Sequence, residues 1–296
     1  MRILWITLLG VIFQLWMSSP ALRAADAPPQ YDVDYRPNVE FGTGGSHKLR
    51  LHLALPKGGG EKRPGLLFIH GGGWAAGSRD DLSNQIQYAA RYGYVAVSVG
   101  YRFAPQEPFP AQVEDVKCAV RWLRAHAADL KLDGDKLGAI GFSAGAHLAM
   151  MLGVMDKGDG LEGEGGWADQ SSKVQAVVAY FGPTNFQVEL PPVSRGIVKH
   201  FIGFEQSEKP DLYKQASPIT YVSKGDAPML LYQGTEDILV PYDQAWFMAQ
   251  ALTKSKVPGR IELLLGVNHG WNGTEMTRTE RESLDFFARW LRPDQK

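Results

Sequence analysis

The stretch LGAIGFSAG at residues 137–145 joins a short apolar run to a helical pattern over 143–154. The run at 137–140 is typical of a buried strand, and the residues after Ser143 continue with helical spacing. A serine on a sharp turn between a strand and a helix has strained backbone angles, so its neighbours must be small to avoid clashes. The pattern G-x-S-x-G at 141–145 therefore predicts a nucleophilic Ser143 at the start of a helix, where free N–H groups favour a developing negative charge.

Further apolar runs and helical patterns alternate along the chain on both sides of this stretch. The runs lie at 65–69, 94–99, 137–140, 174–180, 229–232 and 261–265, and the helical patterns at 80–91, 111–128, 143–154, 242–254 and 278–291. This alternation predicts βαβ units, and hence a mostly parallel sheet with helices on both faces. Alternating polar and apolar residues at 48–55 predict a half-buried antiparallel strand near a sheet edge. The Pro-rich residues 26–40 are expected to lead into the fold.

Length and composition favour one domain. The chain has 296 residues, of which 44% are hydrophobic and 21% charged, as in ordinary soluble globular proteins. No internal repeat or long linker divides residues 25–296. The irregular stretch 182–226 is expected to form a lid or binding-loop insertion. A net charge of −1 gives no electrostatic reason to expect binding to nucleic acid or to an acidic membrane.

The first 24 residues have the features of a secretory signal peptide. Arg2 precedes the apolar run 3–17, and small residues follow near Ala25. The alternative is an uncleaved membrane anchor, for which the run is short, because a span needs about 20 apolar residues. We expect an exported protein, periplasmic or secreted, with no membrane anchor after cleavage. Cys118 is the only cysteine, so no intramolecular disulfide or Cys-based metal site can form, and Cys118 is expected to be buried.

The sequence HGGGW at residues 70–74 directly follows the strand predicted at 65–69. Acyl transfer creates an oxyanion that needs preformed N–H donors, and consecutive glycines let backbone N–H groups turn toward it. The expected donors are the N–H groups of Gly72, Gly73 and Ala144. A phosphate-binding turn is the alternative, but the Lys-Ser/Thr pair of a P-loop is absent. His70 is expected to hold the loop through hydrogen bonds.

An acid and a base for Ser143 are expected after the last two strands. Glu236 and Asp237 both follow the run at 229–232 and compete for the role of the acid. His269 lies in a Gly-flanked loop after the run at 261–265, where a base belongs. The order serine, acid, histidine along the chain is the one expected when a nucleophile follows this type of turn. His147, one turn after Ser143, is expected to pack or to form hydrogen bonds.

Six motifs together resemble the bacterial esterase branch that includes the hormone-sensitive-lipase-like and the bifunctional acetylxylan/feruloyl esterase families. They are HGGGW at 70–74, YR-x-AP-x-x-x-FP at 101–110, D-V-x-x-A-x-RW-L at 115–123, G-x-SAG-x-HLA at 141–149, GT-x-D-x-x-VP at 234–241 and HG at 269–270. The resemblance covers about residues 45–291. It implies an α/β-hydrolase fold, with a mostly parallel central sheet and a small lid insertion. It also implies a catalytic triad of Ser143 as nucleophile, Asp237 as acid and His269 as base.

Two positions depart from the pattern of many relatives, and both affect the inference of substrate. Phe142 stands where many have an acidic residue, and Ala146 where many have glycine. No long helical cap pattern occurs in residues 26–45, which favours the branch with smaller lids.

The resemblance implies a serine esterase that needs no metal or organic cofactor. Together with the signal peptide, which predicts secretion, it favours short acyl esters, such as acetyl or feruloyl groups of plant polysaccharide. A broad carboxylesterase is the alternative, or an arylformamidase or peptidase using the triad on an amide. A non-catalytic binding module would usually have lost a triad member. Trp74, Tyr101 and Trp271 are expected to contact a small-molecule or polysaccharide ester. Arg102 and His200 are expected to add polar groups along the approach, and 182–226 is too polar to suggest an interfacial lipase lid.

Overall fold

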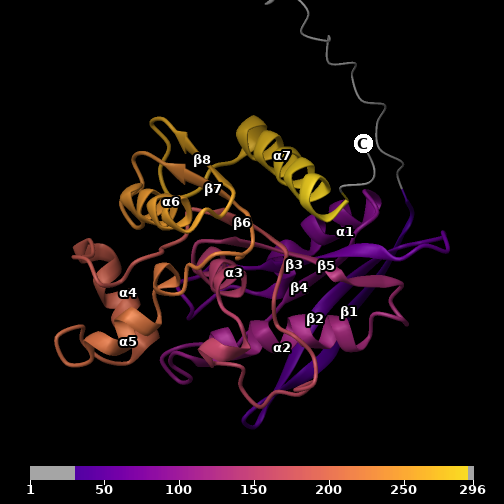
Figure 1. The fold of residues 1–296 in the computed structure, drawn as a ribbon, viewed down its shortest axis with the longest axis horizontal. Coiled ribbons are helices and arrows are strands. Elements are labelled where there is room, and N and C mark those ends of the chain that lie inside the picture. The colour runs from indigo at the N-terminus through magenta and orange to yellow at the C-terminus, as the bar shows by residue number, and fades with distance from the viewer. Residues whose placement is uncertain (1–30, 293–296) are drawn as a thin grey trace, which may run out of the picture.

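The structure, a computed structural model, describes residues 31–292, and its centre is an eight-stranded sheet (Figure 1). The predicted signal peptide at 1–24 lies outside the described residues. The strands are β1 (Val33–Gly44), β2 (His47–Pro56), β3 (Arg63–Ile69), β4 (Val95–Val99), β5 (Leu132–Phe142), β6 (Ala176–Tyr180), β7 (Met229–Gly234) and β8 (Gly259–Leu264). Their order is β1-β2-β4-β3-β5-β6-β7-β8. β2 pairs antiparallel with β1 and β4, and all other pairs are parallel.

Helices cover both faces of this sheet. They are α1 (Ser83–Arg91) and α7 (Gly273–Leu291) on one face, and α2 (Ala111–Ala125), α3 (Ala144–Val154) and α6 (Asp243–Ser255) on the other. Successive residues of a strand point to opposite faces. Leu66 and Phe68 of β3 accordingly pack toward α1 and α7, whereas Leu67 and Ile69 pack into the core beneath α2 and α3. The predicted α/β-hydrolase fold is confirmed.

The sequence did not predict the strand β1, because its residues were expected only to lead into the fold. It pairs with β2 along the sheet edge, with register shifts between Arg36 and Val39 and between Glu40 and Gly42. These irregularities and the many exposed side chains of an edge strand break the alternation of polar and apolar residues. Pro37 is tolerated there because an edge strand needs fewer N–H donors.

The insertion 182–226 forms short helices beside the sheet. They are α4 (Pro192–Ile202), α5 (Pro210–Gln215) and the 3₁₀ turn η3 (Pro218–Thr220), and Figure 1 shows α4 and α5 standing to one side of the strands. Each begins with a proline, whose fixed φ and missing N–H suit the first position of a helix. Two further 3₁₀ turns, η1 (Arg79–Leu82) and η2 (Lys157–Asp159), precede α1 and follow α3.

Two smaller observations complete the fold. Cys118 is buried, as expected, and burial raises the pKa of its thiol to about 11. Among residues 31–292, no helix combines the length and the apolar character that crossing a membrane requires.

Candidate active site

Ser143 lies on the turn between β5 and α3, with φ 54° and ψ −118°. This left-handed backbone is strained for a residue with a side chain. Close packing explains the glycines on both sides. A Cβ on Gly141 would overlap the carbonyl oxygen of Gly145, and a Cβ on Gly145 would overlap that of Ile69. The Ser143 N–H donates to the Tyr180 carbonyl at 2.9 Å, which ties the turn to the end of β6.

The side chains of Ser143, His269 and Asp237 form one chain of hydrogen bonds. Ser143 Oγ lies 2.9 Å from His269 Nε2, and His269 Nδ1 lies 2.7 Å from Asp237 Oδ2. A carboxylate only accepts hydrogen bonds, so Nδ1 donates to it, and Nε2 is left to accept from the Ser143 hydroxyl. The imidazole is therefore oriented to remove the proton of Ser143.

Asp237 is buried and its oxygens are fully engaged. Oδ1 accepts from the N–H groups of Leu239 and Val240 at 2.9 and 2.8 Å, and Oδ2 also accepts from Gln233 Nε2 at 3.0 Å. These N–H donors take the place of water around the buried carboxylate and stabilise it. Glu236, the competing candidate, is exposed. The geometry thus brings Asp237, and not Glu236, to the histidine.

Aromatic rings support His269 from behind. Phe181, which directly follows β6, packs edge-on to the imidazole at 4.8 Å, and Trp271 packs edge-on to Phe181 at 5.2 Å. The Trp271 indole N–H donates to Thr279 Oγ1 on α7 at 3.1 Å. Phe181 was missed from the sequence, although it follows a predicted parallel strand as the other site loops do.

The loop after β3 lies directly against the nucleophile. A Cβ on Gly71 would stand 2.9 Å from the Phe142 carbonyl oxygen and 3.3 Å from Ser143 Cβ. Gly72 and Gly73 have φ of 106° and 58°, and within residues 31–292 their N–H groups donate no hydrogen bond. Ala144 is the first residue of α3, where N–H groups have no partner inside the helix. These three N–H groups are therefore free to bind an oxyanion.

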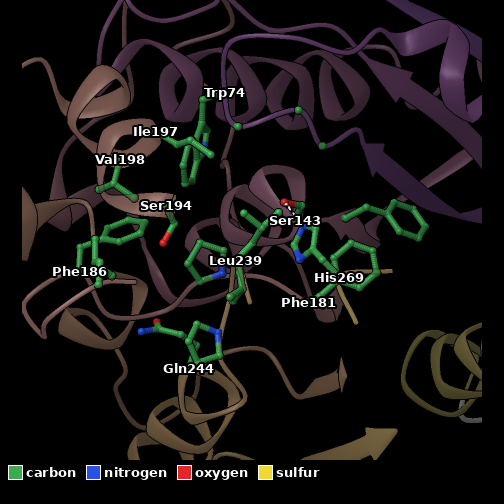
Figure 2. Close-up of a pocket in the computed structure, with 18 residues that line it drawn as sticks. Trp74, Ser143, Phe181, Phe186, Ser194, Ile197, Val198, Leu239, Gln244 and His269 are labelled. Atoms are coloured by element: carbon green, nitrogen blue, oxygen red, sulfur yellow. Dashed lines mark hydrogen bonds between the residues drawn. The ribbon is translucent and has the colours of Figure 1, made fainter. Parts of the chain in front are cut away.

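A pocket of about 360 Å³ opens beside Ser143 and His269. Figure 2 shows Trp74, Phe186, Ser194, Ile197 and Val198 gathered on one side, with Ser143, His269 and Phe181 on the other. Most of the side chains that line it are apolar, and half of the lining residues come from the insertion and from Leu239, Val240 and Pro241 in the loop after β7.

The polar side chains in the pocket wall are already paired. Ser194 Oγ donates to the Pro191 carbonyl at 3.2 Å. Gln244 Oε1 accepts from the N–H groups of Thr184 and Asn185 at 2.8 Å each, and its Nε2 donates to the Asn185 carbonyl at 3.1 Å. The pocket therefore suits an apolar group held next to the nucleophile.

Comparison with protein families places the chain in a known group. The model of the family BD-FAE matches residues 51–252, which is more than half of the chain. The chain belongs to the BD-FAE family. The match includes the loop after β3, the Ser143 turn and Asp237, but ends before His269.

Individual relatives of this BD-FAE chain carry esterase names. It is 30% identical to esterase LipC of Mycobacterium tuberculosis over 73% of its own length and 55% of that protein. The chain spans about half the length of the curated relatives it matches.

Two solved structures match over almost their whole chains. A carbohydrate esterase from gut microbiota has 25% identity and a TM-score of 0.76, over 89% of this chain and 98% of that one. A thermophilic esterase of Thermogutta terrifontis with bound propionate has 26% identity and a TM-score of 0.72, over 90% and 97%.

Three of the residues expected along the substrate approach lie behind it in this BD-FAE chain. The Tyr101 hydroxyl donates to the carbonyls of His70 and Gly71 at 3.0 and 3.2 Å, so Tyr101 braces the loop from beneath. The Arg102 guanidinium binds the buried carboxylate of Asp115. Trp271 packs against Phe181, behind His269, as described above. The expectation of a polar approach built from these side chains is corrected to an apolar pocket.

Three further expectations have mixed outcomes. His200 is exposed on α4 and does not line the pocket. Trp74 does line the pocket, but one face of its ring is stacked on Phe201 at 4.1 Å. His70 holds the loop as expected, because its Nδ1 donates to the Gly71 carbonyl at 2.8 Å, and burial lowers the pKa of His70 and so favours the neutral ring.

Proposed function

We propose that the protein is a serine hydrolase of carboxylic esters that works through a covalent acyl-enzyme. The observation that carries the proposal is the hydrogen-bonded chain from Ser143 through His269 to Asp237. His269 Nε2 takes the proton of Ser143 as Oγ forms a bond to the ester carbonyl carbon. The bond to the leaving alcohol then breaks, and His269 gives the alcohol oxygen its proton. Asp237 keeps Nδ1 protonated throughout.

Deacylation repeats this sequence with water. Water gives a proton to His269 Nε2 and attacks the acyl carbon, and the carboxylic acid leaves as the proton returns to Ser143 Oγ. In both steps the N–H groups of Gly72, Gly73 and Ala144 would stabilise the oxyanion. The free state of the Gly72 and Gly73 N–H groups and their place beside Ser143 support this role.

The substrate that we propose is an ester with a short acyl chain or a compact aromatic acyl group, such as acetate or ferulate. The apolar pocket beside Ser143 supports such a group, since none of the polar side chains that line it within residues 31–292 is left unpaired to bind sugar hydroxyls. A polysaccharide would then form the alcohol part outside the pocket. The carbohydrate esterase named above supports a polysaccharide as the alcohol part, and the esterase with bound propionate supports a short acyl part.

Two other readings use the same residues. A broad carboxylesterase would hydrolyse many alcohol esters alike, and an arylformamidase or peptidase would cleave an amide. A panel of p-nitrophenyl esters of rising chain length, acetylated xylan, methyl ferulate and N-formylkynurenine separates them. We expect release of acetate or ferulate, and cleavage of the amide alone would contradict the proposal.

Replacement of Ser143 by alanine tests the reaction itself. Ser143→Ala should abolish ester hydrolysis and labelling by a fluorophosphonate, with an unchanged melting temperature. Ser194→Ala is the matched control, because Ser194 lines the same pocket but donates to a backbone carbonyl. It should still be labelled. Labelling that persists in Ser143→Ala would assign the nucleophile to another residue.

We also propose that the protein is exported, to the periplasm or beyond the cell, after removal of residues 1–24. The basis is the basic start, the apolar run and the small residues near Ala25. N-terminal sequencing of the protein from a cell fraction should find a start near Ala25, and a cytosolic form that begins at Met1 would overturn this.

A further inference from the structure

Three segments that are distant in the sequence meet at His147. The residue lies on α3, and its backbone N–H donates to the Ser143 carbonyl at 3.1 Å in the first turn. Its side chain is fully buried and does not line the pocket. The ring contacts the loop after β3 through Trp74, and the insertion through Phe201 and the Ala216 carbonyl.

The hydrogen bonds of His147 determine which ring nitrogen carries the proton. The Trp74 indole nitrogen lies 3.2 Å from Nδ1, and an indole N–H can only donate, so Nδ1 accepts. Nε2 therefore carries the proton and donates to the Ala216 carbonyl at 2.7 Å. Burial lowers the pKa of His147 to about 4, although the hydrogen bond to Ala216 offsets part of this shift. Burial therefore keeps the ring neutral. Both nitrogens are occupied, so His147 is not a base for Ser143.

Aromatic rings surround the same histidine. Trp74 and Phe201 meet the imidazole edge-on at 5.2 and 5.5 Å, and Phe186 lies at 5.3 Å. Trp74 is itself stacked on Phe201 at 4.1 Å with an interplanar angle of 14°. The Trp74 indole is thus held by its hydrogen bond to His147 on α3 and by stacking on Phe201 of α4.

The position of the indole bears directly on the proposed oxyanion donors. Trp74 follows Gly72 and Gly73 without a spacer, and its own φ is 59°, a conformation that is strained for a large side chain. Such strain persists only where the surrounding contacts hold the residue in place. Release of the Trp74 ring would let the glycines relax and would turn their N–H groups away from Ser143.

We propose that His147 is a positioning residue of the hydrolase, which holds the oxyanion loop against the nucleophile helix and the insertion through its hydrogen bonds to Trp74 and Ala216. The proposal rests on the hydrolase function proposed above. Its consequence is kinetic. Loss of the His147–Trp74 bond weakens the binding of the transition state, while the parts of the apolar pocket wall on α4 and in the loop after β7, which bind the ground state, stay in place.

The test compares His147→Leu, His147→Gln, Trp74→Phe and the double variant His147→Leu/Trp74→Phe. Displacement of an oxyanion donor costs about 100-fold or more in kcat when complete, so we expect about 10- to 100-fold for His147→Leu, with KM changed by less than about threefold. Gln can donate through its amide N–H and accept through its amide oxygen, so His147→Gln should recover part of the loss. Trp74→Phe keeps a ring but removes the N–H, and should also lower kcat.

The double variant and a distant histidine provide the controls. If both single changes act through one bond, their effects on kcat are not additive, and the double variant is about as slow as the slower single variant. His126 also packs against tryptophans and bonds a backbone carbonyl, Trp122, at 2.9 Å, but it lies away from the pocket. His126→Leu should lower the melting temperature and leave kcat unchanged.

Each outcome supports or overturns the proposal. If His147→Leu lowers the melting temperature but leaves kcat unchanged, His147 has only a structural role. Additive effects of the two single changes on kcat would lead to the same conclusion. If His147→Leu does not fold, Trp74→Phe alone decides, and an unchanged kcat overturns the proposal. The ester hydrolase function fails separately, if Ser143→Ala stays active or if the wild-type protein cleaves only the amide.

Discussion

The two sides of the pocket are held by different forces. The reacting side consists of Ser143, Asp237 and His269, which hydrogen bonds of defined direction connect over 2.7 to 2.9 Å. The insertion side consists of α4 and neighbouring residues of the insertion 182–226. It lines the pocket with Ile197, Val198 and other apolar side chains. Hydrogen bonds require particular atoms in particular places, whereas apolar packing tolerates many side chains of similar volume.

This difference predicts different responses to substitution. Changes on the reacting side should reduce the rate for every substrate, because each atom there takes part in a proton transfer or orients one. Changes on the insertion side should alter which ester is preferred and leave the chemistry intact. His147 belongs to neither side alone, since it joins the two through Trp74 and Ala216.

The largest expected effect is that of Asp237→Asn. An amide in place of the carboxylate would present N–H to His269 and favour the wrong tautomer, which costs about 10⁴-fold in kcat in the serine protease that serves as the reference. Glu236→Gln is the matched control, because Glu236 is adjacent but exposed, and it should change kcat less than about threefold. Steady-state kinetics on one p-nitrophenyl ester measure both, and the opposite ranking would give the acid role to Glu236.

The same contrast explains what could be predicted from the sequence. Ser143, Asp237 and His269 follow strands that are recognisable as short apolar runs, and each lies in a motif whose chemistry is local. The contacts of α4 are not local. Ile197 reaches Gly73 across 124 positions of sequence, and no pattern within the helix indicates that neighbour.

Several side chains were placed wrongly for a related reason. Tyr101 and Arg102 are polar residues close to the site in sequence order, and they were expected to face the substrate. They face inward, because backbone carbonyls and the buried carboxylate of Asp115 need partners there. Leu239 and Val240 were not predicted to line the pocket, although the run of apolar residues after Asp237 was an available signal.

The next effect in size is a loss of stability at acid pH caused by the buried side chain of His147. Its pKa is about 4 in the folded protein, against 6.5 for an unperturbed histidine. As the pH falls below about 6.5 the unfolded chain binds a proton that the folded protein does not, so the free energy of unfolding decreases until about pH 4. A difference of this size corresponds to about 3 kcal/mol at most. His147→Gln removes the titration, so denaturation in urea should show the wild type losing more stability than the variant between pH 7 and pH 4. A difference between the two proteins that does not change with pH would contradict the buried neutral ring.

The smallest expected effect is a change of acyl preference caused by Ile197→Ala. Ile197 lines the pocket beside the oxyanion loop, and a Cβ on Gly73 would lie 2.9 Å from its Cγ2. Truncation removes three carbons from the pocket wall beside the oxyanion loop. One methylene in a fully enclosed pocket is worth roughly 10-fold or more in kcat/KM, and since Ile197 is 37% exposed we expect about three- to tenfold in favour of hexanoate over acetate. Val193→Ala is the control, because Val193 lies on the same helix, is exposed and does not line the pocket.

Two ester series complete the experiment, p-nitrophenyl esters of rising acyl length and acetates of rising alcohol length. A shift in the first series alone means that the insertion side holds the acyl group. A shift in the second alone would place the alcohol there and contradict the proposed arrangement, while equal kcat/KM ratios in both series would show that α4 does not select the substrate.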